Sequence, residues 1–100
     1  MKSYLNLVGL AFRAGKCTLG EEAILRAIRS EKAELVLIAK DAGARTKKTM
    51  IDKCTYYRVP YIIVEEDREA LSHAIGKSAR VAVAILDKGF AKGIKSFFGN

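Results

Sequence analysis

The chain has 100 residues, half of them apolar, and carries 18 Lys and Arg against 11 Asp and Glu, a formal net charge of +7. This length and apolar content predict one domain, residues 1–100, with a core of its own. An isoelectric point near 9.6 favours an anionic partner, nucleic acid above all, over a basic protein without one.

Several classes of protein are excluded or disfavoured. No stretch approaches 18 apolar residues and the N-terminus lacks a signal-peptide cleavage pattern, so we expect a cytoplasmic protein that does not span a membrane. Cys17 and Cys54 cannot form a disulfide framework, lack neighbours at metal-ligand spacing, and lie far in sequence from His73. We expect two small buried thiols, a surface histidine, and no metal or cofactor.

The first element is a helix. Ser3 can cap it, it runs to about Ala14, and Gly15 ends it. Apolar residues cover so much of its surface that we expect it to be mostly buried.

Helix and strand patterns alternate along the rest of the chain. After a short strand at Cys17 and Thr18, the expected elements are a helix from Gly20, a buried strand over 35–39, a helix capped by Thr46 and running through Tyr57, a strand over 61–64, a helix capped by Asp67, a buried strand over 81–86 and a last helix capped by Asp87. The inward residues of the last helix are expected to be Phe90, Ala91, Ile94 and Phe97. This alternation predicts an α/β fold with a largely parallel or mixed sheet covered on both faces.

The sequence offers little for catalysis. The acidic pairs Glu21–Glu22 and Glu65–Glu66 are adjacent in sequence, so the two side chains of each pair diverge. His73 has no evident partner, and the loop over 43–48 lacks the glycine spacing of a phosphate-binding loop. We therefore expect a protein that is not an enzyme and has no small-molecule substrate.

A binding surface is better supported. Gly20 begins a helix whose free N–H groups can receive an anion, and Lys40 follows the buried strand. The loop Ile75-Gly76-Lys77-Ser78-Ala79-Arg80 places two cations among small and apolar residues, which suits an unstacked base. The alternatives are that Glu21 and Glu22 only complement the helix dipole and that the loop is an ordinary connection.

Four segments resemble the kink-turn-binding ribosomal proteins, the group of the large-subunit proteins called "seven-A-e" and "thirty-e", and its small bacterial paralogues. The segments are Gly20 with Arg26-Ala27-Ile28, the strand and turn over 33–42, Val59-Pro60-Tyr61, and Leu71 to Gly76 with the strand over 81–85. They match the family's Gly-x-Asn-Glu-x-x-Lys-Ala-Ile, its Asp-Ala turn, its Val-Pro-Tyr and its Leu-Gly-x-Ala-x-Gly. The resemblance covers residues 3–90.

The resemblance implies a three-layer α/β/α sandwich, with about four strands in a mixed sheet and about five helices, that binds structured RNA. We expect the protein to be a monomer. In the family, the head of the second helix enters the widened groove at tandem G·A pairs and the loop before the last strand holds the bulged nucleotides. It therefore implies that Gly20, Glu21, Glu22 and Arg26 lie at the groove and Ile75, Gly76, Lys77, Ser78, Ala79 and Arg80 at the bulge.

The chain departs from the family's motif at two positions. Glu22 stands where the family has Asn, and Ala23 where it has Glu. A carboxylate can accept hydrogen bonds from guanine but cannot donate as Asn does. The alternative interpretation is a ribosome-associated protein whose main partner is another protein and which uses its basic face only for tethering.

Overall fold

The computed structural model describes residues 3–99, in which helices and strands alternate. The elements are α1 Tyr4–Arg13, β1 Cys17–Leu19, α2 Glu21–Arg29, β2 Leu35–Ile38, α3 Ala44–Tyr57, β3 Tyr61–Ile63, α4 Arg68–Ala74, β4 Ala82–Ile85, α5 Lys88–Lys95 and a 3₁₀ turn, Ser96–Phe98. The strands form one sheet in the order β1-β4-β2-β3, in which β2 and β3 are parallel and the other neighbours antiparallel. The predicted mixed sheet is confirmed.

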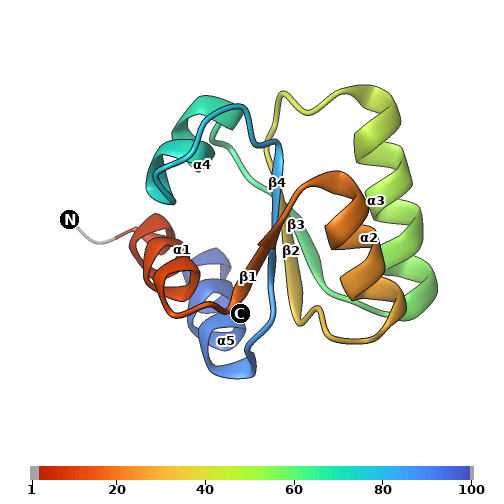
Figure 1. Ribbon diagram of the computed structural model, residues 1–100, viewed down its shortest axis with the longest axis horizontal. Helices are drawn as coiled ribbons and strands as arrows, with labels where there is room; N and C mark the ends of the chain where they lie inside the picture. Colours follow the sequence, from red (N-terminus) through yellow and green to blue (C-terminus); the bar gives the residue numbers. More distant parts are fainter. Residues whose placement is uncertain (1–2, 100) are drawn as a thin grey trace.

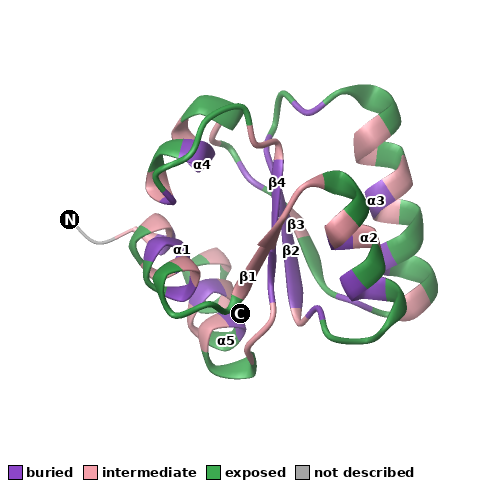
Figure 2. Cartoon of the chain, in the orientation of Figure 1, coloured by how far each residue is buried: buried purple, intermediate pink, exposed green. Residues whose placement is uncertain are grey.

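The sheet is the middle layer of three. Helices α1, α4 and α5 cover one face and α2 and α3 the other, as Figure 1 shows. Each residue of β2 and of β4 is buried, which Figure 2 shows as two purple strands between the helices. The predicted α/β/α sandwich and the strand buried on both faces are therefore confirmed.

Short polar side chains set three of the helix starts as predicted. The Ser3 hydroxyl accepts a hydrogen bond from the Leu5 amide, at 2.9 Å. Asp67 and Asp87 accept in the same way from the amides three residues on, each at 2.9 Å. These caps satisfy backbone donors that have no partner within the helix.

The predicted start of α3 is wrong. The helix begins at Ala44 with Gly43 as its N-cap, and the Gly43 carbonyl accepts from the Lys47 amide at 2.9 Å. The chain turns into helical geometry before it reaches Thr46, which therefore lies inside the first turn. Its hydroxyl is free to contact a neighbouring helix.

Two predictions of burial are also wrong. Only one face of α1 is buried, because the helix packs against α4 and α5 on one side, and Leu10 on its other side is 48% exposed. Phe97 is 45% exposed, because α5 gives way to the tighter 3₁₀ turn and the helical period is lost there. Phe98 turns inward instead, with its ring centroid 4.9 Å from that of Tyr4. No helix within residues 3–99 has the length and apolar character needed to cross a membrane.

Candidate nucleic-acid interface

The head of α2 presents unpaired backbone donors. Gly20 is its N-cap with φ +89°, a backbone conformation that L side chains rarely adopt, and no side chain of residues 3–99 caps the helix. The Gly20 carbonyl accepts from the Ile24 amide at 2.9 Å, so the amides between them have no partner within the helix. Glu21 and Glu22 are both exposed in this first turn. This end of the helix is therefore open to a ligand.

The two glutamates of this turn differ in their contacts. The Thr46 hydroxyl of α3 donates to Oε1 of Glu21 at 3.2 Å, which ties Glu21 to the neighbouring helix. No hydrogen bond or ion pair within residues 3–99 engages the Glu22 side chain. Glu22 is therefore the carboxylate of this turn that is free to reach a partner.

The loop between α4 and β4 is fixed by a buried hydroxyl. Ser72 is 1% exposed, and its Oγ accepts from the Arg80 amide at 2.7 Å and donates to the Arg80 carbonyl at 3.1 Å. Gly76 and Ala79 bend the loop with φ +70° and +59°. Ile75 is 5% exposed and packs into the core, so it supports the loop from below.

The sheet brings this loop to the head of α2. Strands β1 and β4 are antiparallel, with Leu19 opposite Val83, so the residues that follow β1 lie beside those that precede β4. Figure 2 shows both segments at the same end of the sheet, coloured as intermediate and exposed residues. A hollow of about 120 Å³ separates them, lined by Gly20, Glu21, Ile24, Met50, Ala79, Arg80, Val81 and Ala82. Two predicted segments far apart in sequence therefore share one site.

Arg80 is the charged side chain that joins the two segments. It lines the hollow, and its Nε is buried without a hydrogen-bond partner within residues 3–99. A buried guanidinium nitrogen without a partner is costly, and an incoming acceptor would relieve that cost. The sequence predicts Arg80 as a site residue, but no local pattern in it indicates that Ser72 would hold Arg80 or that Thr46 would hold Glu21.

The structure places other predicted residues outside the hollow. Arg26 is exposed one turn further along α2, on the side that faces Thr18 and Leu86. The Lys40 carbonyl accepts from Nζ of Lys47 at 2.9 Å, while the Lys40 side chain is exposed.

Lys77 belongs to the opposite side of its loop. Its Nζ lies 5.7 Å from the centroid of the Phe12 ring, a cation–π contact with α1. Gly76 and Ser78, on either side of it, are exposed. Lys77 therefore lies outside the hollow, beside α1 and α4, with Asp41, Asp67 and Glu69 among its neighbours.

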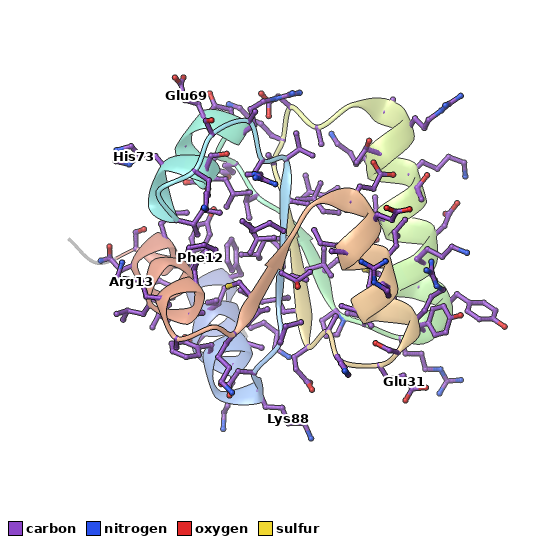
Figure 3. All side chains as sticks on the ribbon, viewed as in Figure 1. Phe12, Arg13, Glu31, Glu69, His73 and Lys88 are labelled. Atoms are coloured by element: carbon purple, nitrogen blue, oxygen red, sulfur yellow. The ribbon has the colours of Figure 1, made fainter. Side chains whose placement is uncertain are left out.

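The chemistry of the remaining polar groups is structural. Burial raises the pKa of the Cys17 thiol and of the Cys54 thiol to about 11, so both are protonated at neutral pH. His73 and Glu69 point outward from α4 (Figure 3). Desolvation acts to raise the pKa of Asp41, but hydrogen bonds from Arg68 and its charge hold that pKa below its ordinary value. This pair ties the end of β2 to the start of α4.

The model of the ribosomal protein L7Ae/L30e/S12e/Gadd45 family matches residues 2–95. The chain belongs to this family. The RNA-binding protein YlxQ of Bacillus subtilis (strain 168) is 49% identical over 88 residues, which are 88% of this chain and 87% of the relative. Large ribosomal subunit protein eL30 of Yarrowia lipolytica is 35% identical, over 82% of this chain and 76% of its own.

Two solved structures share the fold of this chain. A structure from Bacillus halodurans has a TM-score of 0.92 at 37% identity and covers 97% of each chain. The Giardia lamblia 15.5kD RNA binding protein has a TM-score of 0.79 at 24% identity, over 93% of this chain and 85% of its own, and so shares the fold. The expected family is confirmed, and it is a family of ribosomal and RNA-binding proteins rather than of enzymes.

Proposed function

We propose that this protein binds RNA and recognises a kink-turn, with its tandem G·A pairs and bulge, using one chain for each kink. The observation that carries the proposal is the shared hollow, which joins the head of α2 to the loop before β4. The relatives named as RNA-binding and ribosomal proteins, together with the net charge of +7, support an RNA partner.

Each part of the site has a separate task in this proposal. The open head of α2 enters the widened groove, where Glu22 accepts from guanine edges and Arg26 contacts a phosphate. The loop over 75–80 encloses the bulged nucleotides, with Arg80 donating from its unpaired Nε. Phosphate contacts set the register of the complex and base contacts set its specificity.

Binding to matched RNAs tests the proposal. We expect a kink-turn RNA to bind more tightly than the same RNA whose G·A pairs are replaced by Watson–Crick pairs. The logarithm of its affinity should also fall steeply with the logarithm of salt concentration, because phosphates release counterions. Equal affinity for the two RNAs, or a flat salt dependence, would instead favour a protein as the main partner.

Arg26→Ala should weaken the binding of many kinked RNAs to a similar extent, because a phosphate contact carries no sequence information. It should also reduce the salt slope by about one contact. Arg29→Ala, a change in an exposed cation further along α2, is the matched control. Unchanged affinity of Arg26→Ala at low salt would show that this face of the helix does not meet RNA.

Arg80→Ser should reduce RNA affinity more than Lys77→Ser, because Arg80 lines the hollow and the Lys77 ammonium lies over Phe12. The double variant should bind weakly yet stay within about 0.5 kcal/mol of wild-type stability, because Lys77 is exposed and the half-buried Arg80 side chain makes no hydrogen bond within residues 3–99. Isothermal calorimetry and thermal melting measure the two quantities. A large drop in melting temperature without a loss of affinity would make the loop purely structural.

A further inference from the structure

No strand within residues 3–99 pairs with the outer edge of the sheet at β3. The Val36 amide donates to the Pro60 carbonyl at 3.0 Å, and the Val64 amide donates to the Ile38 carbonyl at 2.8 Å. With Leu37 opposite Ile62, this parallel register turns the N–H and C=O groups of Ile62 toward β2. The N–H and C=O groups of Tyr61 and Ile63 therefore point outward, away from the sheet.

The side chains of this edge are apolar and partly exposed. Tyr61 is 38% and Ile63 43% exposed on one face, while Ile62 packs against the core on the other. The strand itself carries no charge that would discourage pairing. An edge of this kind is a template for another strand.

We propose that a second copy of this chain pairs antiparallel along β3, with the two-fold axis passing through Ile62. In that register Tyr61 of each copy lies opposite Ile63 of the other. Both residues turn their backbone groups outward, so the two copies exchange four N–H···O=C bonds. Residues directly opposite share a face, so each exposed tyrosine packs on an exposed isoleucine.

The charges beside the strand favour a second copy over a foreign strand. Arg58 precedes β3 and is exposed, whereas the acidic run over 65–67 follows it. An antiparallel pair about Ile62 brings the basic end of each copy to the acidic end of the other. Because no residue of this edge lines the hollow at α2, the dimer leaves both proposed RNA sites open.

Sedimentation over a concentration series tests the association. The patch is small, so we expect a dimer dissociation constant between about 10 µM and about 1 mM. Ile63→Lys should raise the dimer dissociation constant at least tenfold, because each lysine would replace an apolar contact with Tyr61 of the other copy and the two like charges would flank the axis. Leu10→Lys is the matched control, since Leu10 is 48% exposed on α1, and should leave association unchanged.

Cysteine pairing tests the register. Ile62 meets its own symmetry mate at a non-hydrogen-bonded position, where Cα atoms lie about 4.5 Å apart, a separation that a disulfide spans. Ile62→Cys should therefore form a covalent dimer under mild oxidation. Tyr61→Cys should not, because it and its mate lie more than about 7 Å apart. The unsubstituted chain, oxidised in the same way, shows whether Cys17 or Cys54 forms a covalent dimer by itself.

These outcomes decide the inference without RNA and therefore independently of the proposed function. A chain that stays monomeric across the whole concentration range would overturn it and restore the monomer expected from the sequence. Equal disulfide formation at positions 61 and 62 would also overturn it. So would a dimer that persists in Ile63→Lys but is disrupted by Leu10→Lys. Circular dichroism establishes that each variant is folded.

Discussion

Replacing Gly9 by Ala should destabilise this protein by about 1–3 kcal/mol, the usual cost of overpacking. A Cβ at Gly9 would lie 2.7 Å from the carbonyl oxygen of Ala74, a backbone atom at the end of α4 that cannot move alone. Helices α1 and α4 would have to separate. At an exposed position inside a helix, Gly→Ala stabilises a protein by about 1 kcal/mol. At Gly9 the steric clash outweighs that gain, so the substitution is destabilising.

Gly93→Ala is the matched control for this effect. Gly93 lies inside α5, and the one atom of residues 3–99 that a Cβ there would meet is a terminal carbon of the flexible Leu7 side chain, at 3.2 Å. We expect it to be neutral or stabilising. Thermal unfolding separates the two variants, because each kcal/mol moves the melting temperature by about 4–8 °C in a domain of this size. Equal melting temperatures would mean that α1 and α4 are not in close contact.

This prediction extends to the RNA site. The Gly9 contact holds Ala74, and the loop that encloses the proposed bulge site begins at the next residue. A displaced α4 would move Ser72 and, with it, the two hydrogen bonds that fix Arg80. We therefore expect Gly9→Ala to lower RNA affinity even at temperatures where it is fully folded.

Local patterns in the sequence predict most of the fold because local forces decide it. The continuous apolar run at Leu35–Ile38 and the capping residues Ser3, Asp67 and Asp87 act within a few residues of themselves. The prediction that Phe97 points inward is wrong because its orientation depends on where α5 tightens into a 3₁₀ turn. The packing of Phe98 on Tyr4 influences that point.

The candidate site was only partly predictable. Its two segments carry recognisable motifs, but their adjacency depends on β1 and β4 being antiparallel, which local periodicity does not reveal. The Ser72 clamp and the Thr46 contact to Glu21 join elements that are distant in sequence. A serine in a helix and a threonine before a basic run have more common local explanations.

The carboxylate that departs from the family's motif gives the sharpest test of recognition. Glu22→Ala should weaken binding to an RNA with tandem G·A pairs by about 1–3 kcal/mol, because a guanine edge loses its acceptor. Glu22→Gln keeps an acceptor and removes a charge that phosphates repel, so it should bind as well as wild type or better. Glu34→Ala is the matched control, since it also removes one carboxylate but lies at the opposite end of the sheet, where its amide donates to the Ile85 carbonyl at 2.7 Å.

Inosine separates base recognition from electrostatics. It lacks the N2 amino group of guanine. Replacing the guanines of the G·A pairs by inosine should therefore lower the affinity of the wild-type protein more than it lowers the affinity of the Glu22→Ala variant. If Glu22 only complements the helix dipole, its loss changes stability by a few tenths of a kcal/mol to about 1 and leaves binding unchanged or tighter. Tighter binding by Glu22→Ala, with no difference between guanine and inosine, would reduce Glu22 to a stabiliser of the helix end. A loss of affinity that inosine reproduces in wild type would show instead that this chain reads guanine with a carboxylate where its family uses an amide.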